Sequence, residues 1–127
     1  MTEAVLDTSA ILALYNREPG ADRVAEVIPN AVVSAVNLAE AAAKLLDKDV
    51  SERAIDTYLA RLALQIIAFD AGQARATARM RPATRGFGLS LGDRACLVLA
   101  QSLDLPALTA DQIWAELDIG VKVSLIR

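Results

Sequence analysis

Four acidic residues, Asp7, Glu40, Asp93 and Asp111, each stand where an expected strand has just ended or an expected helix is beginning. The chain has no histidine and one cysteine, which excludes histidine-based nucleophilic catalysis and zinc sites built from His and Cys ligands. Chemistry would therefore use carboxylates, hydroxyls, lysines or arginines. Any bound metal would be a hard ion that prefers oxygen, such as Mg²⁺ or Mn²⁺.

Carboxylates packed together repel one another, and their pKa values rise unless a cation neutralises them. A bound divalent cation lowers the pKa of a coordinated water, and a second cation about 4 Å away stabilises the leaving oxygen of a displacement. A protein without histidine can hydrolyse a phosphodiester in this way. Ser9 and Thr109, each two residues from one of the acids, are candidate donors that orient ligands or waters. Helix capping and strand termination explain these two hydroxyls equally well.

Asp93 has a second interpretation, because it opens the apolar stretch "SLGDRACLVL". Ser90 and Asp93 have the spacing of a capping box, and acids favour the positive end of a helix. Each acid taken alone is explained by such a cap. Four acids at matching ends of one sheet instead predict a shared site.

The elements that position these residues alternate between short apolar strands and helices, which predicts an α/β fold with a five-stranded parallel sheet covered on both faces. Strands are expected at 3–7, 31–34, 65–69, 106–109 and 121–126. Helices are expected at 8–16, 20–28, 37–48, 52–64, from Asp70 to about Arg81, from Ser90 onward, and at 111–117, with a loop at 82–88. Ligands of such sheets bind beyond the carboxyl ends of the strands near a topological switch point, where the four acids fall.

The length of 127 residues predicts a single domain over 1–127. No apolar run approaches the roughly 18 residues that span a bilayer. The first ten residues, "MTEAVLDTSA", lack the basic start and apolar stretch of a signal peptide, so a cytoplasmic location is expected. The single cysteine, Cys96, lies inside an apolar helix and is interpreted as a packing residue.

The net charge of −3 is unevenly distributed along the chain. Residues 71–92 contain no acid and four arginines, Arg75, Arg79, Arg81 and Arg85. A cluster of arginines without local counter-charge suits phosphate, which makes this segment a candidate for RNA binding. The alternative is a solvated basic face, or one that pairs with acids elsewhere in the fold.

Four stretches of the chain resemble the PIN-domain ribonucleases, and specifically the VapC toxins of bacterial type II toxin–antitoxin pairs. They are "VLDTSAILAL" (5–14), "SAVNLAEAAAKL" (34–45), "GLSLGDRACLVLA" (88–100) and "LTADQIW" (108–114). They occur in the order and at the spacing of the family and together span nearly the whole chain. The resemblance implies a PIN-like fold and an endoribonuclease that depends on Mg²⁺ or Mn²⁺.

The acidic quartet of the family falls on Asp7, Glu40, Asp93 and Asp111, as catalytic residues and metal ligands, and its hydroxyl positions fall on Ser9 and Thr109. Glu116 and Asp118 compete with Asp111 for the fourth metal role. The resemblance also implies a VapB-like antitoxin that blocks the acidic site, a homodimer, toxin–antitoxin hetero-oligomers, and a transfer or ribosomal RNA as substrate. Apolar surface for such partners is expected at Leu12, Leu14, Tyr15 and the helices within 38–62.

Other functions remain in competition with this one. A haloacid-dehalogenase-like phosphatase needs a second Asp where this chain has Ser9, and a receiver domain needs a lysine after the fifth strand, where only Lys122 is available, inside the expected last strand. A housekeeping RNA-processing PIN nuclease is one alternative. A non-catalytic α/β binding module, in which every acid is only a helix cap, is another.

Overall fold

The computed structural model describes residues 2–127, so Met1, the first residue of the expected domain, lies outside the described residues. Its centre is a five-stranded sheet in which all neighbouring strands are parallel and the order is β3-β2-β1-β4-β5. The strands are β1 (Ala4–Leu6), β2 (Ala31–Ser34), β3 (Gln65–Ile67), β4 (Ala107–Thr109) and β5 (Val123–Leu125). This confirms the predicted sheet. Strands β2 and β3 lie on one side of β1, and β4 and β5 lie on the other. The strand order therefore reverses between β1 and β4, which makes that pair the topological switch point.

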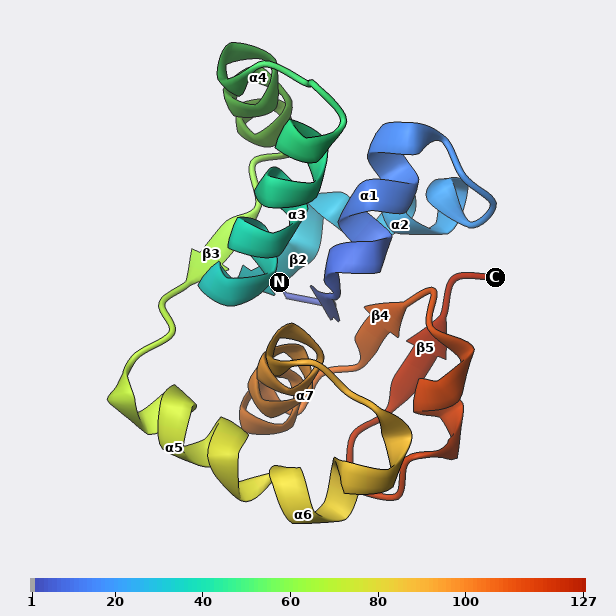
Figure 1. Cartoon of the computed structure of the whole chain (residues 1–127). Helices are drawn as coiled ribbons and strands as arrows, with labels where there is room; N and C mark the ends of the chain where they lie inside the picture. Colours follow the sequence, from blue (N-terminus) through green and yellow to red (C-terminus); the bar gives the residue numbers. More distant parts are fainter. Residues whose placement is uncertain (1) are drawn as a thin grey trace.

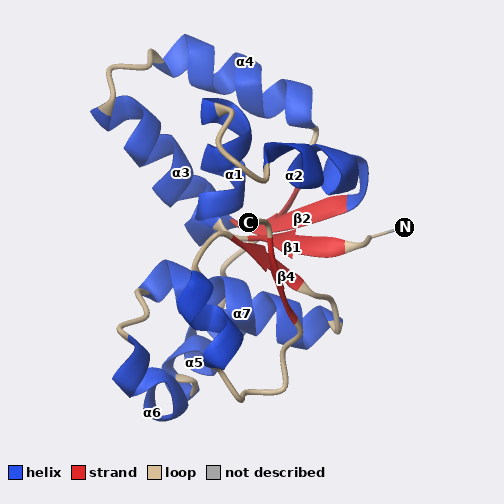
Figure 2. Cartoon of the chain, turned by 90° about the vertical axis from the view of Figure 1, so that its right-hand side faces the viewer, coloured by secondary structure: helices blue, strands red, loops and turns tan. Residues whose placement is uncertain are grey.

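Helices cover both faces of the sheet, as predicted (Figures 1 and 2). Figure 2 shows α1 to α4 on one side of the strands and α5 to α7 on the other. The α-helices are α1 (Thr8–Asn16), α2 (Ala21–Val27), α3 (Ala35–Asp47), α4 (Glu52–Leu62), α5 (Ala71–Arg79), α6 (Arg81–Thr84) and α7 (Leu91–Leu103). The 3₁₀ helices are η1 (Ile28–Asn30), η2 (Arg85–Phe87) and η3 (Gln112–Glu116).

Side chains from the two faces of the sheet pack into two separate apolar cores. Val5 and Val32 point to the core that contains α7, with Trp114 and Cys96 also buried there. Their neighbours Leu6 and Val33 point to the core that contains α1 and α2. Successive residues of a strand face opposite sides, so a sheet buried on both faces reads as the continuous apolar runs seen in this sequence.

The predicted bounds of most strands and helices lie within a few residues of the observed bounds, and polar side chains cap the starts of α4 and α5. Ser51 accepts from the Ala54 N–H, and Asp70 from the Gln73 N–H. The strands are shorter than predicted at one or both ends, except β2, and the helix expected at 111–117 is the 3₁₀ helix η3.

The loop predicted at 82–88 was wrong, because residues 81–87 form α6 and η2. Pro82 stands in the first turn of α6, where its missing N–H would have no partner in any case and its fixed φ suits a helix. The Thr84 hydroxyl, which is buried, donates to the Met80 carbonyl oxygen at 3.0 Å and fastens this turn to the end of α5.

No helix among residues 2–127 combines the length and the apolar character that a membrane crossing requires.

Candidate active site

Asp7 is the centre of the candidate site. It follows β1 directly and occupies the N-cap position of α1, yet its side chain makes no capping hydrogen bond. Its Oδ2 instead accepts from the Ser9 hydroxyl at 2.7 Å and from the Thr109 hydroxyl at 2.8 Å. Its Oδ1 is buried and has no partner among the described residues. A buried carboxylate oxygen without a partner is costly, so this oxygen is available to a ligand.

The Thr109 hydroxyl joins the ends of the two strands at the switch point. While donating to Asp7, its oxygen accepts from the Asp111 backbone N–H at 3.0 Å. The Ser9 oxygen likewise accepts from the Ala110 N–H at 2.9 Å and lies 3.2 Å from the Thr109 oxygen. Both hydroxyls therefore use donor and acceptor capacity at once, which determines where Asp7 points.

Glu40 reaches the same region from the middle of α3. Its Oε1 accepts from the Thr8 hydroxyl at 3.0 Å. Asn37, fully buried one turn earlier, donates to the Thr8 oxygen and to the Gly92 carbonyl, both at 3.1 Å. A Cβ at Gly92 would overlap the Glu40 carboxylate. The absence of a side chain at Gly92 thus lets α3 and α7 approach with Glu40 between them.

Asp93 has the structure that the capping box predicted. Its Oδ2 accepts from the Ser90 N–H at 2.9 Å, while the Ser90 hydroxyl accepts from the Asp93 N–H at 3.1 Å. This reciprocal pair starts α7 and fixes Asp93 in the first turn of the helix. The negative charge of Asp93 is also close enough to act on Asp7.

The electrostatics of the site place three acids near one another. Burial raises the pKa of the Asp7 carboxyl; its two hydroxyl partners oppose this effect and the charge of Asp93 adds to it. Burial also raises the pKa of the Cys96 thiol, and the charges of Asp7, Asp93 and Glu40 raise it further. Cys96 lies one turn of α7 beyond Asp93, so these acids gather around the same end of this helix.

Asp111 is placed differently from the other three. It is exposed, and its Oδ1 accepts from the Ile113 N–H at 3.1 Å as the N-cap of η3. Glu116 is exposed at the end of η3. Asp118 lines a hollow with Arg79 and Gln101, two turns of α7 away from Asp93. Asp118 therefore lies apart from the site. Asp111 remains connected to it, because its backbone N–H donates to the Thr109 hydroxyl.

The four arginines Arg75, Arg79, Arg81 and Arg85 are all exposed, on α5, α6 and η2. None contacts the acids directly in the hydrogen bonds and ion pairs described for residues 2–127. Arg79 lies in the hollow with Asp118, an acid from another part of the chain. Arg85 lies in η2, the turn that leads into Ser90 and the start of α7.

The donor set of the site suits a divalent cation that prefers oxygen. Among residues 2–127, no three acidic or thiol side chains lie close enough together to hold a metal ion. Mg²⁺ commonly takes one or two protein carboxylates and completes its octahedron with water and phosphate oxygens. The unpartnered Oδ1 of Asp7, with Glu40 and Asp93 nearby, meets that requirement.

Sequence reasoning missed Thr8, Asn37 and Gly92 as parts of the site. The sequence offered two signals: a polar residue, Asn37, three positions before Glu40 in an otherwise apolar stretch, and a glycine directly before Asp93. Neither signal identifies the residue that Asn37 or Gly92 contacts, because the two are 55 residues apart and meet only where α3 packs against α7.

Comparison with known proteins agrees with this architecture. The model of the PIN domain family matches residues 4–120, so the chain belongs to the PIN domain family. No curated protein matches the chain in sequence.

Several solved structures share the fold. A toxin–antitoxin complex from Klebsiella pneumoniae has a TM-score of 0.74 at 20% identity, covering 98% of each chain. DNA-bound VapBC from Salmonella typhimurium has a TM-score of 0.71 at 19% identity, covering 100% of each. VapC20 from Mycobacterium tuberculosis, described as a toxin that cleaves the sarcin–ricin loop, has a TM-score of 0.72 at 16% identity, covering 94% of this chain and 98% of that one.

Proposed function

We propose that this PIN-domain protein is a VapC-like toxin: an endoribonuclease that depends on Mg²⁺ or Mn²⁺ and is neutralised by a cognate antitoxin. The observation that carries the proposal is the state of Asp7. An aspartate at an N-cap ordinarily caps its own helix, whereas Asp7 gives up that bond. It holds one oxygen with two hydroxyls and leaves the other buried and unpartnered.

In this proposal one or two of the carboxylates of Asp7, Glu40 and Asp93 bind the cation directly and the others act through bound water, while Asp111 contributes from the edge of the site. A bound Mg²⁺ or Mn²⁺ supplies activation of a water and stabilisation of the charge that develops on the phosphodiester. Ser9 and Thr109 orient Asp7, since both donate to its Oδ2. Thr8 orients Glu40 in the same way through Oε1.

The fold neighbours support the partner side of the proposal. The neighbours from Salmonella typhimurium and Klebsiella pneumoniae are toxin–antitoxin complexes, and VapC20 is described as a toxin that cleaves the sarcin–ricin loop. We extend these properties to this chain: a VapB-like antitoxin, a homodimer, toxin–antitoxin hetero-oligomers, and a transfer or ribosomal RNA substrate. An apolar hollow formed by Leu38, Leu59, Leu64 and Ile66 offers surface for a protein partner.

The test is cleavage of total transfer RNA and ribosomal RNA by purified, antitoxin-free protein in Mg²⁺, Mn²⁺ or EDTA. The wild-type protein is expected to yield discrete fragments with metal and none with EDTA, and Asp93→Asn is expected to lose this activity. Asp104→Asn is the matched control. Asp104 is an exposed acid at the opposite end of α7 with φ of 52°, a backbone conformation that asparagine tolerates.

The two alternatives give different results. A non-catalytic module in which each acid is only a cap predicts no cleavage and the same melting temperature with and without Mn²⁺, because an ion that binds only the folded state must raise that temperature. A housekeeping nuclease predicts metal-dependent cleavage that no antitoxin inhibits. A short upstream reading frame for a small DNA-binding protein would favour the toxin.

A further inference from the structure

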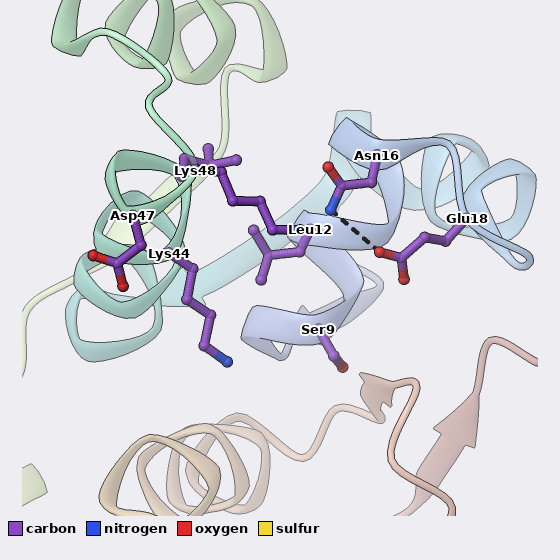
Figure 3. A pocket seen from close by; sticks show the side chains of 8 residues that line it. Ser9, Leu12, Asn16, Glu18, Lys44, Asp47 and Lys48 are labelled. Carbon is purple, nitrogen blue, oxygen red and sulfur yellow. Dashed lines mark hydrogen bonds between the residues drawn. The ribbon is translucent and has the colours of Figure 1, made fainter.

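A pocket of about 370 Å³ lies between α1 and α3 and reaches the candidate active site. Ser9, whose hydroxyl donates to Asp7, is one of its lining residues. Leu12 and Leu45 give it apolar walls, Lys44 lines it from the last turn of α3, and Lys48 lines it from the C-cap position that follows. In Figure 3 the ammonium group of Lys44 and the hydroxyl of Ser9 extend from opposing helices toward the same side, where α7 runs.

The two lysines continue the row of α3 that begins at the active site. Glu40 and Lys44 are four residues apart on α3, about 6 Å along its axis, and Lys48 follows four residues later as the C-cap, just beyond the helix. Like charges at this spacing destabilise a helix slightly. Both lysines are exposed, and neither takes part in an ion pair among residues 2–127. Lys44 is in the last turn of α3 and Lys48 is its C-cap, where cations also interact favourably with the helix dipole. Helix stability explains positive charge at this end of α3, but it does not explain why both lysines line a pocket that reaches Ser9.

The two acids that line the pocket, Glu18 and Asp47, do not pair with these lysines. Glu18 is paired with Arg127 at 3.1 Å and also accepts from the Asn16 amide at 3.2 Å. Asp47 extends away from both lysines in Figure 3. The pocket therefore presents two free ammonium groups and an amide beside apolar side chains, within a part of the chain, residues 1–70, that carries 11 acids and six bases.

We infer that the Lys44–Lys48 side of this pocket binds the sugar–phosphate backbone of single-stranded RNA next to the bond that is cut, an inference that rests on the proposed function. Phosphates that follow one another along an extended strand match a row of cations one helical turn apart. Glu40 at the start of the row lies at the cutting site, Lys44 meets the first flanking phosphate and Lys48 meets the second. The apolar walls accommodate the riboses and bases.

A competing interpretation is that Lys44 only stabilises α3 by pairing with Glu40, since a Glu followed four residues later by Lys is favourable in a helix. The structure argues against it, because the Glu40 carboxylate is directed to Thr8 and Gly92. A protein partner in the pocket is the other competing occupant. Two lysines without an ion-pair partner among residues 2–127, with Asp47 directed away from them, favour a polyanion over a peptide of mixed charge.

The experiment is the binding of polyuridylate in EDTA, where no cleavage occurs, at a series of salt concentrations. Each phosphate contact with a single strand adds about 0.7 to the slope of log affinity against log salt concentration. Lys44→Gln and Lys48→Gln are each expected to reduce the slope by about 0.7, and the double variant by about 1.4. Lys122→Gln, which removes the same charge from an exposed position next to β5, is the matched control.

A second readout separates binding from a general effect on the enzyme. In Mn²⁺ the double glutamine variant is expected to raise KM for RNA with little change in kcat, and the Lys44→Arg/Lys48→Arg variant to behave like the wild type. Equal slopes for the wild type and the double glutamine variant would overturn the inference even if metal-dependent cleavage is present. A slope that depends on the lysines, with no cleavage under any condition, would instead overturn the proposed function while still supporting RNA binding by Lys44 and Lys48.

Discussion

The carboxylate of Glu40 on α3 occupies the space that a side chain at position 92 on α7 would fill. Asn37 donates to the carbonyl of the same glycine at 3.1 Å, so α3 and α7 are joined at the point where Glu40 enters the site. The position of Glu40 therefore depends on a residue that has no side chain of its own.

Gly92→Ala is expected to displace Glu40 and reduce RNA cleavage by about a hundredfold, since an error of about 1 Å in a positioned group costs that much. The free energy of unfolding should change little or rise, because alanine favours the helix over glycine by up to about 1 kcal/mol. Cleavage rate and melting temperature measure the two effects. Gly86→Ala, where a Cβ meets nothing within 4 Å, should retain full activity. Equal activity of the two variants would contradict the assigned role of Gly92.

Asp7→Asn is expected to abolish cleavage while raising the melting temperature of the metal-free protein at neutral pH. Burial raises the pKa of Asp7 above its ordinary value of 3.8, with a further contribution from Asp93. The folded protein therefore binds a proton at Asp7 more readily than the unfolded chain does. The stabilisation from that proton is complete below about 3.8 and is lost as the pH rises through the raised value.

The difference in melting temperature between Asp7→Asn and the wild type, measured in EDTA, should consequently grow as the pH rises from about 3.8 toward neutrality. Adding Mn²⁺ should reverse the order by stabilising only the wild type. A difference that is constant with pH would show that burial does not penalise the Asp7 charge.

Thr109→Val is expected to lower metal affinity ten- to hundredfold, the usual cost of losing a partner that orients a ligand. It removes one of the two donors to Asp7 Oδ2 and also leaves the Asp111 N–H without its acceptor, which costs about 1–3 kcal/mol of stability if no water replaces it. Thr109→Ser keeps the hydroxyl and should retain most of the affinity. Titration with Mn²⁺ followed by thermal unfolding measures both quantities, and equal affinities for Val and Ser would refute the role of the hydroxyl.

Arg79→Glu and Arg85→Glu are expected to weaken RNA cleavage while leaving the fold intact, since both side chains are exposed. The larger loss should come from Arg85, which lies just before the start of α7, whereas Arg79 shares its hollow with Asp118. Cleavage at low RNA concentration and circular dichroism measure the two outcomes. Unchanged cleavage in the Arg79→Glu/Arg85→Glu double variant would remove this segment from the RNA path.

The fold and the identity of the candidate residues were largely predictable because they depend on local patterns. Continuous apolar runs indicated strands buried on both faces, and capping residues such as Ser51, Asp70 and Ser90 marked the starts of helices. The failure at 82–88 has the same local origin. The segment 82–88 contains one proline and two glycines, which are typical of a loop, but Pro82 stands in the first turn of α6, where proline favours a helix.

By itself, the sequence determined which residues are able to perform chemistry: the strand ends, the acids next to them, and the exclusion of histidine-based mechanisms. Only the tertiary structure decided how those acids differ. Asp93 and Asp111 cap their helices, whereas Asp7 is turned away from its own helix by two hydroxyls, one of them 102 residues distant. The reason is physical: a cap is satisfied by backbone groups within a few residues, but a buried carboxylate takes its partners and its pKa from whatever the fold packs around it.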